Sequence, residues 1–405
     1  MPVNKRFNLY MIMLGMITAM PPLSIDIGLP ALPNMSVDLG TATAVATQTL
    51  ALFILGNALA PVLFGPLSDR IGRRPVLVAG LLVYTVAAVG CTFAPSMDML
   101  LSLRFVQGCA AGAAGVLPMA IVRDRFTGTE ARKLQSTLAM LNSVAPMIAP
   151  LIGGALMWFF GWRAVYGFLA AAGLGLTVLA YTQYLETRQA HPEPPGHSVF
   201  TAYRITLSDR QYLTSALVVA FNFGGLFAYI TTSPLVFVEH FGTSASAYAS
   251  IFALTALGTF SGAMLNKRLA VRRVADTSIL RAATLASVVF STTQLGCALL
   301  GYSPISLVIF LVLGANVCTG MVLPNGTHKA LENLSSTAGT GAALLRSSQM
   351  LSAAAATFVI TLIHELGSLK SMAIVMCVCS VSSLVCFIYA NAVSNHRQSC
   401  TSILD

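Results

Sequence analysis

Long apolar stretches alternate with short polar stretches along the whole chain. Each apolar stretch is about 20 residues long or longer, which is the length that an α-helix needs to cross the hydrocarbon core of a bilayer. The polar stretches between them carry charged residues, Gly and Pro, which are typical of turns. The pattern predicts twelve membrane-spanning helices, at approximately residues 8–30, 43–66, 75–95, 97–122, 133–157, 162–185, 212–237, 246–266, 277–300, 303–324, 337–363 and 370–393.

A longer, Pro-rich polar segment at 186–211 divides the predicted spans into six and six. We therefore expect three parts: an N-terminal six-helix bundle at 1–185, a cytoplasmic central loop at 186–211, and a C-terminal six-helix bundle with a short cytoplasmic tail at 212–405. A short repeat supports this division, because Gly65-x-x-x-Asp69-Arg70 follows the second span and Gly262-x-x-x-Asn266-Lys267 follows the eighth. Parallel repeats about an axis along the membrane normal place such segments at equivalent positions.

The composition agrees with a membrane protein. Of the 405 residues, 56% are hydrophobic and 9% are charged, and the mean hydropathy is +0.77. A typical soluble domain has about 25% charged residues. These values exclude a soluble protein of this length and predict an all-α membrane protein with twelve transmembrane helices in two pseudo-symmetric bundles.

The positive charge is distributed unevenly between the two sides of the predicted membrane. With the N-terminus in the cytoplasm, all but four of the 23 Lys and Arg residues fall on the cytoplasmic side. Arg163 and Lys370 lie in outer loops, and Arg104 and Arg346 lie within spans. Because cytoplasmic loops of membrane proteins carry an excess of Lys and Arg, we expect both termini in the cytoplasm. The net charge of +9 therefore indicates orientation and no nucleic-acid partner.

The most concentrated group of charges lies between the second and third predicted spans. Turn-forming and charged residues cannot lie in hydrocarbon, so they predict a loop where the chain emerges and turns back. Positive-inside charge explains the arginines but does not explain an Asp among them. The residues concerned are Gly65, Asp69, Arg70, Gly72, Arg73 and Arg74.

Pairs of glycine at four-residue spacing occur in the fourth and eighth spans. They are Gly108-x-x-x-Gly112 and Gly258-x-x-x-Gly262. Small residues at this spacing let helix backbones approach closely. The favoured interpretation is close helix packing, which would also suit helices that move against each other.

Two opposite charges lie inside spans of the first half. Asp26 is the only carboxylate well inside a span there, and Arg104 lies roughly 10 Å along the fourth span at 1.5 Å per residue. We hypothesise that the two form a proton-coupling switch, because burial disfavours a charged carboxylate and a nearby guanidinium favours it. The alternative is that Asp26 caps a helix end near Pro30 and that Arg104 snorkels outward.

Arg346, in the eleventh span, has two interpretations. It could balance the charge of an anionic substrate, or its side chain could snorkel to the cytoplasm, and we favour snorkelling. Polar or aromatic residues near the middle of other spans are candidates for a substrate pocket, although each alone is more often used for interhelical hydrogen bonding or packing. The pocket candidates are Asn57, Gln107, Met119, Asn142, Asn222, Phe223, Tyr229 and Asn316.

The sequence offers little for other kinds of chemistry. The eight cysteines have no zinc-site spacing, and we expect no metal. No phosphate-binding Gly-Lys-Ser/Thr loop is present, so we expect no cofactor and no use of ATP within this chain. The six histidines lie in predicted loops and far apart, which argues against a membrane-embedded enzyme.

Several motifs together resemble those of the major facilitator superfamily. The segment 65–75 resembles the loop between helices 2 and 3 of that family, and the run 103–108 resembles its drug/proton antiporter motif. The run 24–33 is similar to the bicyclomycin-resistance (Bcr/CflA) branch. The run 145–154 is similar to the antiporter motif of exporting members, with Ala149 where Gly usually precedes the Pro.

The resemblance implies roles for these residues. It supports Asp26 and Arg104 as the proton-coupling pair and implies that Asp69 faces a helix end of the second half and pairs with a basic residue such as Arg123. Such a pair would act as a latch on the cytoplasmic side, together with the glycines and arginines around it. The resemblance also favours a hinge that seals against proton leak, over the alternative of an inert kink that neighbouring helices tolerate. The hinge residues are Pro146, Pro150, Gly153 and Gly154.

The sequence thus predicts a proton-driven exporter of small, partly apolar molecules such as antibiotics, toxins or metabolites. We expect it in a bacterial inner membrane, working by alternating access and as a monomer. A symporter that imports one metabolite is the alternative among transporters. A membrane enzyme and a non-transporting sensor are less favoured classes.

Overall fold

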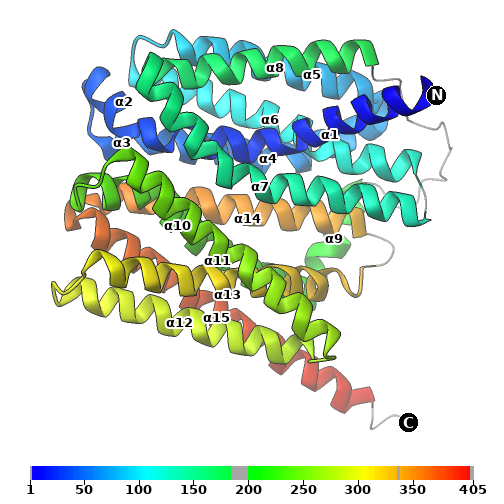
Figure 1. The fold of residues 1–405 in the computed structure, drawn as a ribbon. Coiled ribbons are helices and arrows are strands. Elements are labelled where there is room, and N and C mark those ends of the chain that lie inside the picture. Colours follow the sequence, from blue (N-terminus) through cyan, green and yellow to red (C-terminus); the bar gives the residue numbers. More distant parts are fainter. Residues whose placement is uncertain (1, 127, 184–198, 335–337, 402–405) are drawn as a thin grey trace. The chain divides into compact units, whose positions relative to one another are not determined.

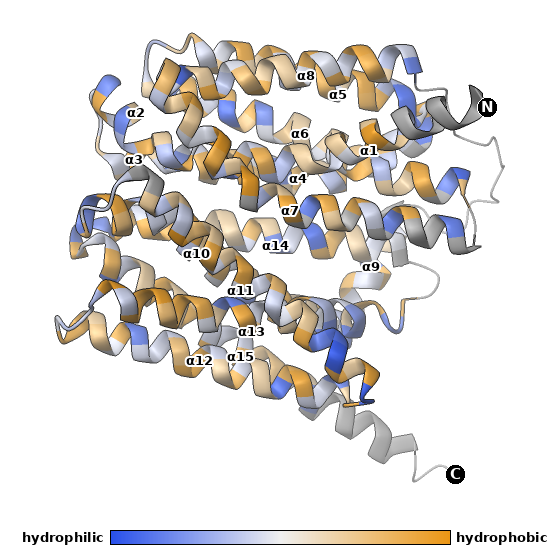
Figure 2. Cartoon of the chain, viewed as in Figure 1, coloured by the Kyte–Doolittle hydropathy of each residue, from blue (hydrophilic) through white to orange (hydrophobic). Residues whose placement is uncertain are grey.

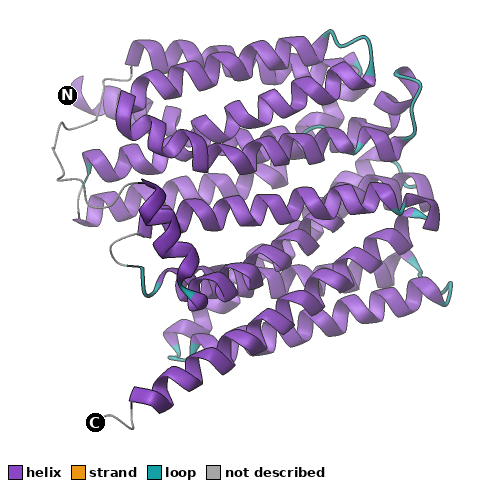
Figure 3. Ribbon diagram, turned by 180° about the vertical axis from the view of Figure 1, so that it is seen from behind, coloured by secondary structure: helices purple, strands orange, loops and turns teal. Residues whose placement is uncertain are grey.

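The computed structural model describes residues 2–126, 128–183, 199–334 and 338–401. All regular structure within these ranges is helical (Figure 3). Twelve helical segments are long and apolar enough to cross a membrane. The predicted all-α membrane fold with twelve spans is therefore confirmed.

The chain divides into two compact units. The first comprises Met1–Glu193 with Ser244–Ala249, and the second comprises Pro194–Thr243 with Ser250–Asp405. The long helices of the first unit pack side by side (Figure 1). Its elements are α1 (Pro2–Asp26), η1 (Leu29–Ala31), α2 (Leu32–Asp38), α3 (Thr43–Ala46), α4 (Gln48–Ile71), α5 (Arg73–Thr92), α6 (Met97–Arg125), α7 (Gly128–Phe160) and α8 (Arg163–Gln183).

The second unit also contains six long helices. Helix α10 packs against α13, α14 and α15, and α12 packs against α13 and α15. The elements after the central segment are α9 (Val199–Ser208), α10 (Arg210–Pro234), η2 (Leu235–His240), α11 (Ala245–Val271), α12 (Asp276–Leu299), α13 (Ile305–Leu331), α14 (Ala338–Leu362), η3 (His364–Leu366) and α15 (Ser368–Thr401). Part of the segment expected as a loop at 186–211 is thus helical, as α9.

Apolar side chains cover the outside of the helices as well as the inside. Leu82 and Val86 lie one turn apart on α5, and Leu174 and Val178 lie one turn apart on α8; all four are exposed. Hydrophobic colouring accordingly continues over these helices (Figure 2). A soluble protein rarely exposes continuous apolar surface, so these faces are suited to contact with lipid.

Glycine brings α4 and α6 into backbone contact in the first unit. A Cβ added to Gly108 would overlap the carbonyl oxygen of Phe53, and one on Gly112 would lie 2.9 Å from the carbonyl oxygen of Asn57. From the other side, a Cβ on Gly56 would overlap the carbonyl oxygen of Phe105. The packing predicted for the glycine pair at 108 and 112 is confirmed.

The equivalent helices of the second unit, α11 and α13, pack in the same way. A Cβ on Gly258 would lie 2.9 Å from the carbonyl oxygen of Leu313, and one on Gly262 would overlap the carbonyl oxygen of Val317. From the opposite side, a Cβ on Gly320 of α13 would likewise overlap the backbone of α11. The second and fourth spans of each half therefore share one packing device, as an internal repeat requires.

We predict that Gly108→Ala destabilises the protein by about 1–3 kcal/mol, because the new methyl group forces α4 and α6 apart. The matched control is Gly175→Ala on α8, where nothing lies within 4 Å of the new Cβ. Alanine is the better helix former, so this control should be neutral or slightly stabilising. Melting temperatures of the purified variants in detergent give the comparison. Equal melting temperatures for the two variants would contradict the packing argument.

Candidate functional site

The guanidinium of Arg104 lies in the interior of the first unit, and only 1% of the residue is exposed. Its Nη1 donates to Oε1 of Gln107 at 2.8 Å, and its Nη2 donates to the carbonyl oxygen of Ser24 at 3.0 Å. Its Nε donates to the carbonyl oxygen of Thr49 at 3.4 Å. Arg104 thus ties α6 to α1 and α4, and the outward snorkelling considered for it does not occur.

Aromatic side chains complete the surroundings of Arg104. Its guanidinium carbon lies 4.3 Å from the ring centre of Phe53 and 5.5 Å from that of Tyr166. The hydroxyl of Tyr84 is 2.6 Å from that of Ser24, whose carbonyl Arg104 also binds. Ring faces attract a cation, so within the described part of the unit the positive charge is stabilised without a carboxylate partner.

Asp26 is the last residue of α1 and is also buried, with 3% exposed. Its Oδ1 has no hydrogen-bond partner among the described residues. Among the described residues no ion pair joins it to Arg104, whose three hydrogen bonds go to two carbonyl oxygens and to Gln107. The two residues are linked through the backbone instead, since Arg104 binds the carbonyl of Ser24, two residues before Asp26.

The break in the first span directly follows Asp26. The sequence pattern predicts a continuous helix to about residue 30, but α1 ends at Asp26 and the chain continues through η1 and α2. A Cβ on Gly153 of α7 would overlap the carbonyl oxygen of Ile27, so α7 packs directly against the chain at this break. Helix α7 itself is continuous through Pro146 and Pro150, and Gly154 has open space beside it.

The charged segment at 65–74 differs from the expected loop. Helix α4 includes Gly65, Asp69 and Arg70, and α5 begins at Arg73, so Gly72 alone joins the two helices. Gly72 has φ 103°, a conformation that glycine adopts far more readily than other residues. The loop prediction was wrong because a helix can continue beyond the apolar part of its span. Its backbone groups still hydrogen-bond to one another there, even where the side chains are polar.

Arginines after this turn bind α5 to its neighbours. Nε of Arg73 lies 3.1 Å from Oδ2 of Asp124 on α6, and its Nη1 donates to Oγ of Ser68 at 2.6 Å. Arg74 donates to the carbonyl oxygen of Tyr181 on α8 at 2.8 Å. The side chains of Asp69 and Arg123 lie outside the described part of the structure, so their pairing remains a prediction.

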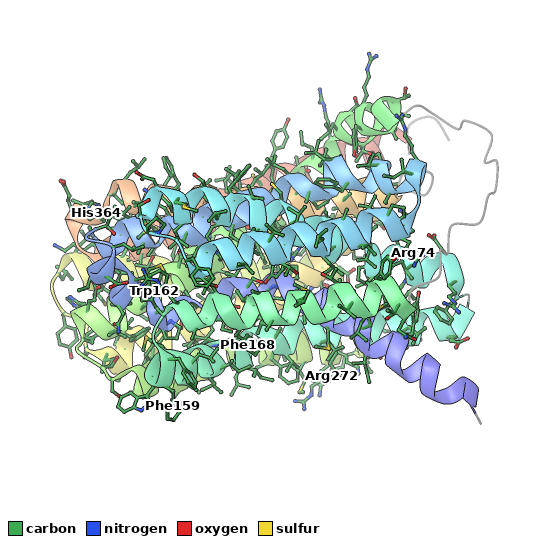
Figure 4. All side chains as sticks on the ribbon, turned by 90° about the horizontal axis from the view of Figure 1, so that it is seen from above. Arg74, Phe159, Trp162, Phe168, Arg272 and His364 are labelled. Carbon is green, nitrogen blue, oxygen red and sulfur yellow. The ribbon has the colours of Figure 1, made fainter. Side chains whose placement is uncertain are left out.

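The opposite end of the first unit carries a second polar cluster. The Asp38 carboxylate accepts hydrogen bonds from Nε1 of Trp162 at 3.0 Å and from Arg163. Arg74 and Trp162 mark the two ends of the unit (Figure 4). The contact between Arg73 and Asp124, on α5 and α6, and the contact between Asp38 and Trp162, on α2 and just before α8, therefore lie at opposite ends of the first unit.

Among the pocket candidates of the first unit, Gln107 binds Arg104, as described above. Asn57 is buried on α4 and its Nδ2 has no partner among the described residues. Met119 is exposed, and Asn142 is half-buried on α7.

In the second unit, two pocket candidates are used for interhelical hydrogen bonds. The hydroxyls of Tyr229 and Thr255 are 2.5 Å apart, and Nδ2 of Asn316 donates to the carbonyl oxygen of Thr255 at 3.0 Å. Asn222 and Asn316 also line a small polar cavity of about 20 Å³. A cavity of this volume has room for a single water molecule.

The side chain of Arg346 extends away from the start of α14, which is the nearer end of its helix. Its guanidinium carbon lies 5.8 Å from the ring centre of Phe223 on α10. The Tyr212 hydroxyl donates a hydrogen bond to the Gly341 carbonyl oxygen, so these two residues lie at the same height along α10 and α14. Phe223 is eleven residues beyond Tyr212, whereas Arg346 is only five beyond Gly341. The favoured interpretation, snorkelling towards the start of α14, was therefore wrong.

Sequence reasoning missed most of the residues that surround the charged groups. Those around Arg104 are Ser24, Thr49, Phe53, Tyr84 and Tyr166, and those around Arg73 are Ser68 and Asp124. Polar or ring-bearing residues within apolar spans were the available signal. Backbone carbonyls, which provide two of the three hydrogen bonds to Arg104, leave no sequence signal.

We predict that Arg104→Lys lowers the free energy of unfolding by about 2–3 kcal/mol, although the charge is kept. A compact ammonium cannot reach both backbone carbonyls, Gln107 and the two rings at once. Arg281→Lys, an exposed change of the same type on α12, is the control and should leave the melting temperature unchanged. An Arg104→Lys variant as stable as wild type would show that these hydrogen bonds do not hold the site together.

Comparison with known proteins gives a consistent result. The chain matches the Major Facilitator Superfamily over residues 12–357. It is 31% identical over 349 residues to the uncharacterized MFS-type transporter YdgK of Bacillus subtilis, covering 85% of this chain and 86% of that protein. It is 28% identical over 348 residues to the bicyclomycin resistance protein homolog of Haemophilus influenzae, with coverage of 85% and 86%.

A solved structure shares the fold. A bacterial homolog to the human lysosomal transporter Spinster, in an inward-facing and occupied conformation, superposes with a TM-score of 0.70 over 95% of both chains. The sequence identity is 17%, so this likeness concerns the fold alone. The family match over most of the chain and the two six-helix halves lead to one conclusion: the chain belongs to the Major Facilitator Superfamily of membrane transporters.

Proposed function

We propose that this transporter exports small, partly apolar molecules in exchange for protons, and that Asp26 carries the proton. The observation that carries the proposal is the buried Asp26 carboxyl group, at a break in a membrane-spanning helix, with one oxygen that has no hydrogen-bond partner among the described residues. An intramembrane ionisable residue is costly and is usually functional. Proton coupling gives such a residue a role that packing does not.

The surroundings of Asp26 fit a group that changes its protonation state. An ionised carboxylate in an apolar interior is costly unless it is paired, and no partner for Oδ1 is present among the described residues. Binding of a proton removes that cost, and binding of a substrate nearby changes it. Proton and substrate would then compete, which is the physical requirement for antiport.

Arg104 has a supporting role in this proposal. Because its charge is stabilised by carbonyls, Gln107 and aromatic rings, it stays in place whether or not Asp26 is ionised. It fixes the end of α1 through the Ser24 carbonyl and keeps a positive potential near the coupling site. Movement of α7 would reach Asp26 through the Gly153 contact at Ile27.

The proposal includes alternating access between the two halves. In it, Asp69 and Arg123 form a latch on the cytoplasmic side, with Arg70, Arg73 and Arg74 around the Gly72 turn. Pro146 and Pro150 allow α7 to bend. We further propose that the protein works as a monomer in a bacterial inner membrane, with both termini in the cytoplasm. The proton gradient would be the energy source, with no cofactor and no enzymatic step.

The name of one relative favours export. The bicyclomycin resistance protein homolog is named for resistance to an antibiotic, and resistance by a transporter implies outward movement. Import of a specific metabolite by proton symport is the second candidate, because a buried carboxyl could equally couple import. The direction of proton movement distinguishes the two functions.

We predict that substrate addition to energised everted membrane vesicles releases protons from the lumen, measured with a pH-sensitive fluorescent dye. Antibiotics, including bicyclomycin, form the first test panel, chosen by a resistance screen in an efflux-deficient bacterium. Asp26→Asn should reduce the signal to that of vesicles without the protein, because the amide cannot carry a proton.

The control is Asp98→Asn, the same chemical change at an exposed position near the start of α6, which should leave the signal intact. Membrane expression of both variants is measured by immunoblot. A normal signal from Asp26→Asn would exclude Asp26 as the proton carrier. Substrate transport without proton release would exclude antiport and favour the symporter.

A further inference from the structure

Arg346 is the most deeply placed charged residue in the spans of the second unit. It lies seven residues inside the span Gly339–Leu362, roughly 10 Å at 1.5 Å per residue. Acidic residues occur only at the ends of the spans of this unit, as with Asp276 at the start of α12 and Glu239 near the end of the span Arg210–His240. The helices of this unit therefore provide no carboxylate at the depth of Arg346.

The side chain of Arg346 has few partners of its own. Its one interaction among the described residues is with the ring of Phe223. Arg104 in the first unit is different, since carbonyls, Gln107 and two rings surround its guanidinium. No hydrogen bond within the described part of the structure engages the N–H groups of Arg346, whereas three such bonds hold Arg104 in place.

Part of Arg346 remains accessible, because the residue is half-buried. Its guanidinium is directed along the helices towards the middle of α10. There the ring of Phe223 packs against that of Phe227, with their centres 4.9 Å apart. The site therefore combines a positive charge, whose N–H donors have no hydrogen-bond partner among the described residues, with the largely buried rings of Phe223 and Phe227 beside it.

A cation at this depth without a counter-ion is costly. A ligand that brings a carboxylate or similar anion removes that cost and forms charge-assisted hydrogen bonds with the guanidinium. The neighbouring Phe223 favours an aromatic body next to the anionic group, because ring pairs contribute beyond their buried area. A neutral ligand with an aromatic body gains only the contact between rings and not the charge-assisted hydrogen bonds.

We propose that Arg346 and Phe223 form a binding site for organic anions with an aromatic body, and that such anions are among the transported molecules. The assignment of these anions as cargo rests on the proposed transport function. The binding site itself does not depend on it, and the two can be tested separately.

The test uses purified full-length protein and a pair of nearly isosteric probes, 1-naphthoate and the neutral 1-naphthamide, with binding measured by calorimetry. We expect 1-naphthoate to bind wild type, and Arg346→Gln to weaken this binding roughly tenfold or more, as expected for loss of hydrogen bonds to a charged group. Arg346→Lys, which keeps the charge, should retain part of the affinity. Binding of 1-naphthamide should be weak and should change little with Arg346→Gln.

Arg281→Gln, at an exposed position of α12, is the matched control and should bind 1-naphthoate as wild type does. Melting temperatures show whether each variant is folded, and Arg346→Gln should be at least as stable as wild type because the removed charge has no protein counter-ion. Absence of 1-naphthoate binding to wild type, or equal binding by Arg346→Gln, would overturn the proposal.

Proton release with 1-naphthoate in everted vesicles separates this inference from the proposed function. Arg346-dependent binding without proton release would leave the site intact and contradict anion export by proton exchange. Proton release with other compounds, together with no binding of 1-naphthoate, would leave the antiporter intact and overturn the anion site.

Discussion

The first half of this transporter depends on how the buried guanidinium of Arg104 is stabilised. Arg104 donates to two backbone carbonyls and to Gln107 and lies against the Phe53 ring. These partners stabilise the charge without an ion pair to Asp26 among the described residues. Asp26 has an oxygen without a hydrogen-bond partner among these residues, at the end of α1, and this is why we propose it as the proton carrier.

Close helix packing and polar contacts at the helix ends hold this arrangement in place. Gly108 brings α6 against α4, and Gly153 brings α7 against the chain just after Asp26. The ion pair between Arg73 and Asp124 connects α5 with α6 at one end of the unit. Backbone contacts of this kind leave little room for gradual deformation, so a change at Asp26 would be transmitted to α7 through a direct contact.

The sequence allowed the span pattern, the glycine packing and the burial of Asp26 and Arg104 to be predicted, because all three follow from residue size and polarity. The partners of Arg104 could not be predicted, because backbone carbonyls are present at every position and do not mark any. The turn at Gly72 was missed for a related reason, since charged residues signal the end of the apolar region and not the end of the helix. The direction of the Arg346 side chain could not be predicted, because it depends on which residues of α10 lie beside which residues of α14. Only the structure provides this register.

The most direct test of the central claim measures protons released by the purified transporter when substrate binds, using a pH-indicator dye in weakly buffered solution. The ligand is the compound that gives the largest signal in vesicles, and its binding is measured in parallel. We expect proton release by wild type and none by Asp26→Asn, with substrate still bound by the variant. Equal proton release by wild type and Asp26→Asn would contradict the central claim.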